Sequence, residues 1–409
     1  MEDHLIYDTA IAVEPEFEAD LLRHTKTWAE IDLGALRRNY HRIRDFVQRH
    51  SPQCETMCIL KADAYGHGAV MCAKALWSEG VRLFGVSCIT EAIQLRSALG
   101  MDADVTILIL GYTLPSDVDL LYKYHISQTV FSLEYAHQLC DEITRLRSVG
   151  NIAAQTPLPI HLKINTGMNR LGFSFDDADR VAAVCEMKEF DAEGIFTHFA
   201  CADDEKSDMT AVQYQRFTGM LSALSSRGIH FLYRHACNSP AVLSDTMMYE
   251  NTVRFGMLLY GCLTPDAPLE TEPVMNFKTT VSHIFQIHKG DTVSYGATFR
   301  AARDTVVATL PVGYADGLIR SMGGASVSVK GHMAPIIGRI CMDQCMIDIT
   351  DFAKDVKVGD TVTIFGSDPH MIDALATVAG TIPYEILCLV GKRVTRVYRD
   401  TSAELKASR

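Results

Sequence analysis

The chain has 409 residues, of which 48% are hydrophobic and 22% charged, and its formal net charge is −12. This composition is ordinary for a globular protein, and the length predicts one large domain plus a smaller one. The acidic balance argues against nucleic acid as the main partner. No run of 18 or more uncharged apolar residues occurs, so no membrane span is expected.

The N-terminal segment is acidic and lacks the basic start and apolar core of a secretory leader, so we expect a cytoplasmic protein. Residues 1–26 are expected to form a poorly ordered extension with no assigned role. The twelve cysteines show neither CxxC pairs nor regular spacing. This pattern favours reduced thiols over a disulfide framework, and we expect no metal site.

From Trp28 onward the pattern becomes regular. Asp32 is a candidate N-cap for a helix that runs to about Gln48, with apolar residues at helical spacing. Eight short apolar runs then alternate with amphipathic stretches. The runs are Met57–Lys61, Arg82–Ser87, Val105–Leu110, Ile126–Val130, Ile160–Ile164, Glu193–Thr197, Phe231–His235 and Thr252–Phe255. The amphipathic stretches include Thr90–Leu99, Glu134–Arg147, Phe175–Met187 and Met209–Arg227.

Buried strands that alternate with helices indicate a parallel sheet covered on both faces, the arrangement of an α/β fold. Eight such units predict a (β/α)8 TIM barrel, which we place at residues 27–264. A doubly wound open sheet is the alternative, but no glycine-rich dinucleotide fingerprint supports it.

Residues 265–409 have a different texture and predict a second, mainly β domain. Turn signals such as Gly290–Asp291 and Gly359–Asp360 separate the strand-like segments, and one short helix is expected near Met371–Val378. The strand-like segments are Thr279–His288, Thr305–Leu310, Ala325–Lys330, Cys345–Ile349, Thr361–Phe365 and Lys392–Tyr398.

Polar residues gather at the predicted C-terminal ends of the barrel strands, where barrel active sites lie. Each has a plain structural alternative: His198 as a core histidine, Arg254 as an ion-pair partner, and Asn238 with Ser239 as a helix cap. Their convergence on one rim favours a functional site. The residues concerned are Lys61, Lys163, Asn165, Arg170, His198, Asn238, Ser239 and Arg254.

The segment MCILKADAYGHG, Met57 to Gly68, places Lys61 between an apolar run and a loop with a tyrosine and two glycines. A lysine desolvated at a pocket mouth can form a Schiff base with a carbonyl cofactor, although a surface lysine is the simpler alternative. Ser239 opens a helix and Gly256 permits close backbone approach, and both fit a phosphate. Together these features suggest pyridoxal phosphate (PLP).

From about Thr27 to the C-terminus the residues resemble the alanine racemase family, the bacterial PLP-dependent amino-acid racemases. The motifs stand in the order and spacing of that family, and the combination of KADAYGHG, SYGATF and CMDQ is very specific. The full set is WAEIDLGALRRNY, KADAYGHG, TGMNRLGF, THFACAD, HACNSPA, VRFGMLLYG, VSYGATF, LPVGYADG, IGRICMDQ and IPYE.

The resemblance implies a barrel followed by a β domain, in a head-to-tail homodimer whose sites are completed by the partner's β domain. It implies that Lys61 carries PLP and acts as one acid/base group, while Tyr295 of the other subunit is the second. Racemisation needs two such groups on opposite sides of a planar carbanion. Lysine and tyrosine have ordinary pKa values near 10, so work near neutral pH requires burial or nearby cations.

The resemblance also implies how the cofactor and a small amino-acid substrate are bound. Tyr65, Ser239, Gly256, Met257 and Tyr384 would hold the phosphate, with Asn238 beside them. Arg254 would contact the pyridine nitrogen and leave it unprotonated, which discourages transamination and decarboxylation. His198 would support Arg254. Arg170 and Met342 would receive the substrate carboxylate, and Asp343 would shape the entrance. Lys163 matches a lysine that is often carbamylated in the family.

Two departures qualify the match: Asn165 and Asn169 stand where the family often has Asp and Gly. Some motifs lean toward serine/alanine racemases, but Tyr384 is kept where those have asparagine, so alanine is the expected substrate and D-alanine for peptidoglycan the expected product. A serine/alanine or broad-specificity racemase is the alternative. A non-catalytic PLP-binding barrel and a PLP decarboxylase are less favoured, because Tyr295 and Arg254 argue against them.

Overall fold

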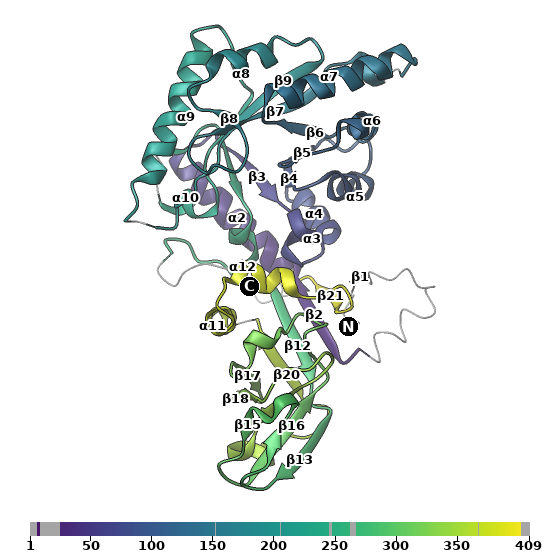
Figure 1. Ribbon diagram of the computed structural model, residues 1–409, viewed down its shortest axis with the longest axis vertical. Helices are drawn as coiled ribbons and strands as arrows, with labels where there is room; N and C mark the ends of the chain where they lie inside the picture. The colour runs from purple at the N-terminus through teal and green to yellow at the C-terminus, as the bar shows by residue number, and fades with distance from the viewer. Residues whose placement is uncertain are drawn as a thin grey trace.

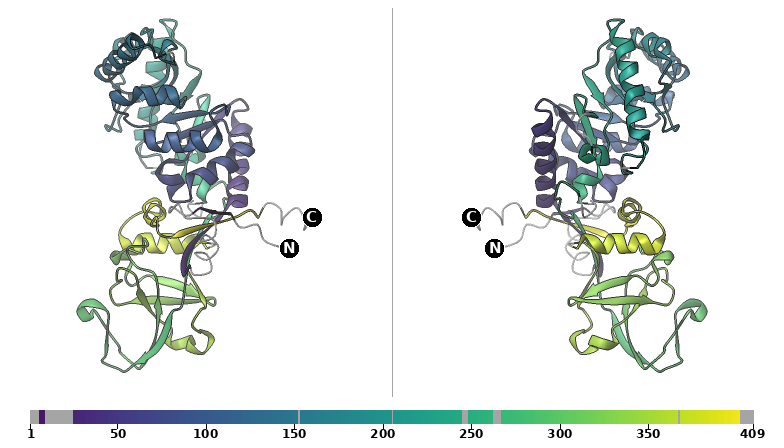
Figure 2. Two further views of the ribbon diagram at one scale, coloured as in Figure 1. Left: turned by 90° about the vertical axis from the view of Figure 1, so that its right-hand side faces the viewer. Right: turned by 90° about the vertical axis from the view of Figure 1, so that its left-hand side faces the viewer.

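A computed structural model describes residues 6–8, 25–151, 153–204, 206–244, 248–261, 267–366 and 368–401. The molecule is elongated, with a barrel at one end and a β-rich part at the other (Figure 1). Figure 2 shows the same two parts from the sides, with α11 and α12 lying where they meet.

Eight parallel strands close the barrel, as the sequence predicts. Each strand pairs with its neighbours along the sheet, and the pairing of β6 with β7 completes the ring. The strands in chain order are β3 (Glu55–Ile59), β4 (Leu83–Val86), β5 (Thr106–Ile109), β6 (Ser127–Val130), β7 (Leu158–Asn165), β9 (Phe190–Phe196), β10 (Tyr233–His235) and β11 (Thr252–Phe255). The two-residue strand β8 (Phe173–Ser174) extends the edge of β7.

Helices surround this ring and bury their apolar faces against it. The side chain of Asp32 accepts a hydrogen bond from Ala35 N at 3.0 Å, which confirms the predicted N-cap. The helices are α2 (Leu33–His50), α4 (Ala69–Ser78), α5 (Ile89–Leu99), α6 (Val118–Lys123), α7 (Leu133–Ser148), α8 (Ala178–Cys185), α9 (Met209–Ser225) and α10 (Ser239–Ser244).

The second part is a ten-stranded sheet with two short helices. Its spatial order is β1 (Ile6–Asp8), β21 (Thr395–Arg399), β2 (Thr27–Asp32), β12 (Met275–Thr280), β20 (Thr361–Phe365), β17 (Ser326–Val329), β18 (His332–Ile337), β19 (Cys345–Asp348), β16 (Thr305–Leu310) and β13 (His283–Ile287). A separate ribbon joins β14 (Thr292–Val293) to β15 (Phe299–Arg300), and the helices are α11 (Pro369–Ala379) and α12 (Pro383–Leu389). Among the described residues no single helix is long and apolar enough to cross a membrane.

Three local predictions need correction. The segment Thr279–His288 is two strands, because the amide of Val281 bonds Asp360 O while that of Ser282 bonds Thr309 O, so the chain passes from one set of partners to another. The first barrel strand ends at Ile59, and Lys61 opens the next element.

The third correction concerns the N-terminal extension. Its residues Ile6–Asp8 form an antiparallel edge strand on β21, and its other residues up to 24 lie outside the described part of the chain. Strand β2, which precedes the barrel in sequence, pairs with β12 and β21 in the second sheet. The N-terminal stretch thus ties the two parts together, and the domain division at 27–264 and 265–409 stays a prediction.

Candidate active site

Lys61 stands at the C-terminal end of β3, as the first residue of the short turn α3 (Lys61–Tyr65). The four residues that follow it all have φ near +53°, a left-handed conformation that costs about 1–2 kcal/mol for each non-glycine residue. Specific hydrogen bonds hold this turn. Glu91 accepts from Ala62 N at 2.7 Å, and Asp63 accepts from Ala69 N at 2.7 Å. The strain fixes the direction in which the chain leaves Lys61.

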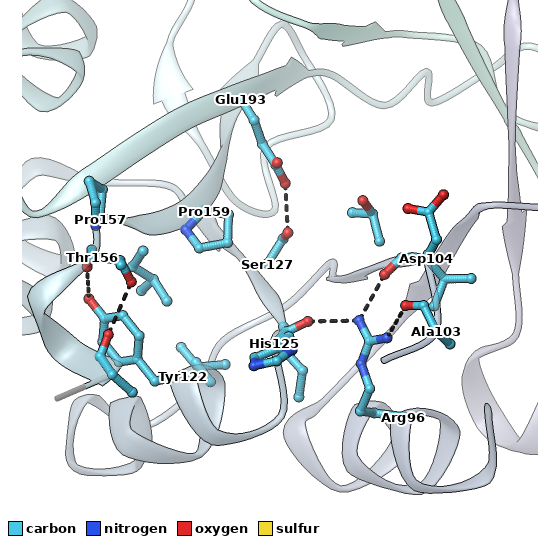
Figure 3. Close-up of a pocket in the computed structure, with 16 residues that line it drawn as sticks. Arg96, Ala103, Asp104, Tyr122, His125, Ser127, Thr156, Pro157, Pro159 and Glu193 are labelled. Atoms are coloured by element: carbon cyan, nitrogen blue, oxygen red, sulfur yellow. Dashed lines mark hydrogen bonds between the residues drawn. The ribbon is translucent and has the colours of Figure 1, made fainter. Parts of the chain in front are cut away.

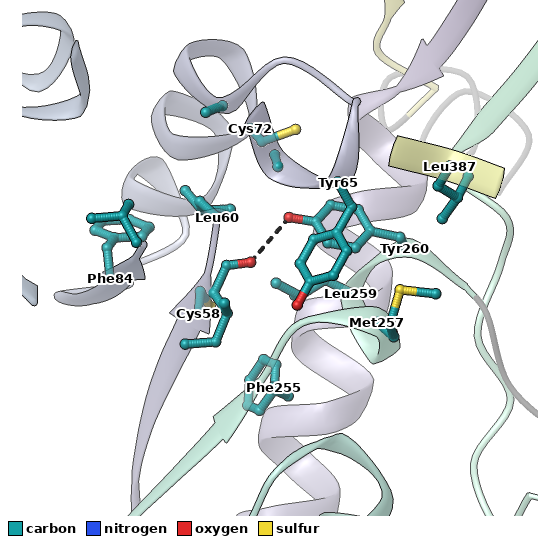
Figure 4. Close-up of a cluster of buried hydrophobic side chains, with 14 of the residues drawn as sticks. Cys58, Leu60, Tyr65, Cys72, Phe84, Phe255, Met257, Leu259, Tyr260 and Leu387 are labelled. Carbon is teal, nitrogen blue, oxygen red and sulfur yellow. Dashed lines mark hydrogen bonds between the residues drawn. The ribbon is translucent and has the colours of Figure 1, made fainter. Parts of the chain in front are cut away.

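Tyr65 is buried at the end of the same turn, between Tyr260 and Tyr384, with ring centroids 5.2 and 6.4 Å away. Figure 4 shows its hydroxyl directed toward the chain that leaves Phe255. That chain continues through Gly256, where an added Cβ would lie 2.5 Å from the tyrosine oxygen. Only glycine therefore allows this close approach.

The hydroxyl of Ser239 also lies beside Gly256. Ser239 Oγ accepts a hydrogen bond from Gly256 N at 3.0 Å, and Met257 is buried in the turn that follows. Two hydroxyls and a bare backbone converge at the ends of β10 and β11, which fits a phosphate group. Asn238 donates to Phe199 O and accepts from Ala241 N, so in the structure it caps α10 and orients Ser239.

Arg254 lies on β11 inside the barrel and is 3% exposed. Its guanidinium donates to three backbone carbonyl oxygens, at Thr197, Ala236 and His235, and to two imidazole nitrogens. The imidazole contacts are His235 Nδ1 at 2.9 Å and His198 Nδ1 at 3.3 Å. No carboxylate contacts it among the described residues, and burial lowers the pKa of Arg254 to about 10.

The cationic side chains at this end of the barrel influence one another. Burial, reinforced by Arg170 and Arg254, lowers the pKa of Lys61. Burial and the neighbouring cations also lower the pKa of His198 to about 2, so its imidazole is neutral. A cluster of positively charged side chains suits a ligand with phosphate and carboxylate groups.

Lys163 on β7 is buried, and its Nζ has no hydrogen-bond partner within the described structure. The amine lies 4.7 Å from the ring centroid of Phe196. Burial, together with Arg254 and Arg170, holds its pKa well below the usual value. A buried amine without a hydrogen-bond partner, and with its charged form disfavoured, can act as a nucleophile toward carbon dioxide, so its surroundings fit carbamylation.

The two departures from the family pattern build a turn. Asn165 Oδ1 accepts from the amides of Gly167 and Asn169, and its amide group donates to Asn169 Oδ1. Asn169 has φ +55°, a conformation that asparagine tolerates better than most residues, which accounts for its standing in a glycine position. This turn presents the exposed Arg170.

The remaining predicted residues lie in the β domain. Tyr295 is 70% exposed on the ribbon between β14 and β15, and Met342 is 53% exposed after β18. In Figure 1 β15 lies low in the β-rich part of the molecule, whereas α3 lies in the barrel part, above the junction of the two parts. Asp343 accepts from Arg393 at 2.7 Å, which fixes the loop that carries Met342. One chain therefore does not bring Tyr295 and Met342 to Lys61, whereas it does bring Tyr384 to Tyr65.

Sequence reasoning missed three polar residues inside the barrel: His161, His235 and Glu193. All three lie in segments that were identified only as strands or motifs. The sequence does contain a signal for them, because ionisable residues are unusual in the buried parallel strands of a barrel. No group of three or more metal-ligating side chains occurs among the described residues.

Comparisons with known proteins match nearly the whole chain. The family model "Alanine racemase, N-terminal domain" matches residues 31–264 and "Alanine racemase, C-terminal domain" matches residues 274–398. Alanine racemase 1 of Clostridium acetobutylicum is 40% identical over 389 residues, covering 92% of this chain and 97% of that protein. The alanine racemase of Methanococcus maripaludis is 36% identical over 382 residues, with coverage of 91% and 98%.

Solved structures agree with these matches. The alanine racemase of Clostridium difficile 630 superimposes with a TM-score of 0.85 at 35% identity, covering 93% of this chain and 97% of that one. The alanine racemase from Bacillus anthracis with bound L-Ala-P gives a TM-score of 0.81 at 30% identity, with coverage of 93% and 96%.

Proposed function

The chain belongs to the alanine racemase family, and we propose on that premise that it interconverts L-alanine and D-alanine and supplies D-alanine for peptidoglycan. The observation that carries the proposal is the placement of Lys61. It stands at the mouth of the barrel with a lowered pKa, beside a buried arginine that contacts no carboxylate in the described structure.

The residues of the site fit PLP. Tyr65, Ser239, Gly256 and Met257 would hold the phosphate, with Tyr384 packed behind Tyr65 and Asn238 orienting α10. The Lys61 amine would attach to the aldehyde carbon. Arg254 would donate to the ring nitrogen, with His198 beside it. When bound, PLP supplies an electron sink for the pair of electrons left on the substrate Cα.

Two side chains would move the α-proton. Burial and neighbouring cations destabilise the ammonium form of Lys61 and lower its pKa, which would favour its acting as a proton acceptor on one side of the substrate. Tyr295 would serve the opposite side. Since it is exposed and lies beside β15 in the β-rich part, whereas Lys61 opens α3 in the barrel part, it would come from a second subunit, so the working form would be a homodimer.

The substrate carboxylate would meet Arg170 and the partner's Met342 loop. A carbamate on Lys163 would place a negative charge near Arg170 and orient it, because the free amine has no hydrogen-bond partner in the described structure. We also propose a cytoplasmic location, on the ground that the described cysteines are all free.

Serine is the second candidate substrate. The segment around His198 leans toward serine/alanine racemases, whereas Tyr384 narrows the space beside the substrate side chain. We therefore expect alanine to be the faster substrate.

The test is racemisation of L-alanine and L-serine by the purified protein with added PLP, followed by chiral separation. D-alanine forming at least about tenfold faster than D-serine supports the proposal. Comparable or faster D-serine would move the assignment to a serine or broad-specificity racemase. Bound PLP with no inversion of either amino acid would refute the racemase function.

A further inference from the structure

A continuous line of hydrogen bonds runs from Arg254 through the barrel interior. Arg254 Nη1 lies 2.9 Å from His235 Nδ1, and His235 Nε2 lies 2.9 Å from His161 Nδ1. His161 Nε2 lies 3.2 Å from Glu193 Oε1, which also accepts from Ser127 Oγ at 2.6 Å. We refer to these five residues as the barrel network.

The direction of every hydrogen bond in the barrel network follows from its two ends. Arginine only donates, so His235 Nδ1 must be the bare, accepting nitrogen, and Nε2 then carries the proton. His161 Nδ1 must accept that proton, which leaves its Nε2–H to donate to Glu193. Both imidazoles are therefore neutral, each in a single tautomer, and the last acceptor is a carboxylate.

The sequence builds this arrangement with two local devices. The pairing of β7 with β9 shifts register, so that Ile160 faces Ala192 and His161 faces Gly194. The extra residue is Glu193, and a β-bulge of this kind re-aims a side chain. An added Cβ at Gly194 would lie 2.2 Å from His161 Nδ1, so only glycine leaves room for the imidazole.

The barrel network spans the barrel from one mouth to the other. His161 and His235 are 0% exposed, and His235 stacks on Phe196 with ring centroids 4.7 Å apart. The Glu193 side chain is 17% exposed and reaches a cavity of about 460 Å³. Ser127 and other first residues of strands line that cavity, so it opens at the N-terminal end of the barrel (Figure 3).

We propose that His161 and Glu193 are positioning residues that hold His235 in the tautomer that accepts from Arg254, and so aim the guanidinium at the cofactor ring. The inference rests on the proposed function. Arg254 contacts no carboxylate in the described part of the chain, so Glu193 acts as its remote counter-charge through two polarised imidazoles.

The electrostatics agree with this assignment. Burial raises the pKa of Glu193, but the hydrogen-bond and electrostatic interactions with His161 and the hydrogen bond from Ser127 outweigh burial and hold the pKa below its usual value. Burial, Arg254 and His161 keep the pKa of His235 well below its usual value. Both directions favour a carboxylate at Glu193 and a neutral imidazole at His235.

The test compares Glu193→Ala and Glu193→Gln with Asp104→Asn, which removes a carboxylate from the same cavity outside the barrel network. Proton-detected NMR of protein labelled with ¹⁵N-histidine, prepared without PLP, reports which ring nitrogen of His235 carries the proton. A His235→Gln variant assigns the signal. The wild type and Asp104→Asn should show a bare Nδ1 and a protonated Nε2.

In Glu193→Ala, His161 loses its acceptor, which makes the other tautomer of His235 accessible. In that tautomer Arg254 Nη1 keeps its hydrogen bond to His235 O and loses the one to Nδ1, so His235 should show mixed tautomers. With PLP, kcat/KM should fall by about 10–100-fold, as for other residues that orient a directly acting group. Glu193→Gln keeps an acceptor but not the charge, so it should keep the wild-type tautomer of His235 and recover only part of the activity loss. An unchanged His235 tautomer in Glu193→Ala, or an equal loss in Asp104→Asn, would overturn the inference. Correct tautomers in a wild type that racemises nothing would instead refute the proposed function.

Discussion

Two regions carry the candidate site residues: the mouth of the barrel, with Lys61 and Arg254, and the tip of the β domain, with Tyr295 and Met342. They differ in how firmly the chain holds these side chains. At the mouth, Arg254 is 3% exposed and makes five hydrogen bonds, and a strained turn fixes the chain after Lys61. At the tip, Tyr295 and Met342 are 70% and 53% exposed. Under the proposed function, a single chain would therefore supply the cofactor-binding residues, and another subunit would have to position the second acid/base group.

The largest effect should come from the mouth. Lys61→Ala should lower racemisation by more than about 10⁴-fold and abolish the absorbance of lysine-bound PLP, because under the proposed function this one residue would serve both attachment and proton transfer. Lys74→Ala, an exposed lysine on α4, is the matched control and should change neither. Near-normal racemisation by Lys61→Ala would remove this residue from the mechanism.

A substitution at the tip of the β domain should cause a smaller but still large loss of racemisation. Tyr295→Phe removes only a hydroxyl, so PLP should bind normally while racemisation falls by about 10²–10⁴-fold in at least one direction. The comparison is with Tyr112→Phe, a half-exposed tyrosine on the barrel that should keep its activity. Full rates in both directions would mean that the tip contributes no acid/base group.

A substitution among the residues proposed to hold the phosphate should have a more modest effect. Gly256→Ala places a Cβ against the Tyr65 hydroxyl, so we expect PLP to bind about tenfold or more weakly, measured by fluorescence titration. Gly219→Ala meets nothing within 4 Å and should leave the affinity unchanged. Equal affinities would show that Tyr65 does not lie against the phosphate site.

The smallest effect concerns acid stability. Burial lowers the pKa of His67 to about 3, so the folded state stays unprotonated while the unfolded state gains a proton below about pH 6.5. The stabilisation is present above that pH and is lost as the pH falls. His67→Asn keeps a donor and should recover about 2 kcal/mol of that loss at pH 5. Denaturant unfolding at pH 5 and 7 measures this, with the exposed His283→Gln as a control; equal pH dependence of wild type and His67→Asn would contradict it.

Much of the fold and of the candidate site could be predicted from the sequence. The eight apolar runs predicted the barrel strands, and the lysine motif predicted where Lys61 stands. The barrel network could not be predicted, because it depends on a register shift at Glu193 and on contacts between strands far apart in sequence. The left-handed turn after Lys61 was hidden for the same reason, since Glu91 and Arg396 that hold it come from other elements.

The most direct test of a site shared between two chains mixes the two inactive variants. Lys61→Ala and Tyr295→Phe subunits are unfolded, combined in equal amounts and refolded with PLP. If Tyr295 serves the partner's Lys61, each hybrid dimer regains one intact site, and random mixing should restore about one quarter of wild-type activity. If both groups act within one chain, every site in every dimer carries a defect. Activity no higher than that of the separate variants would contradict the shared site.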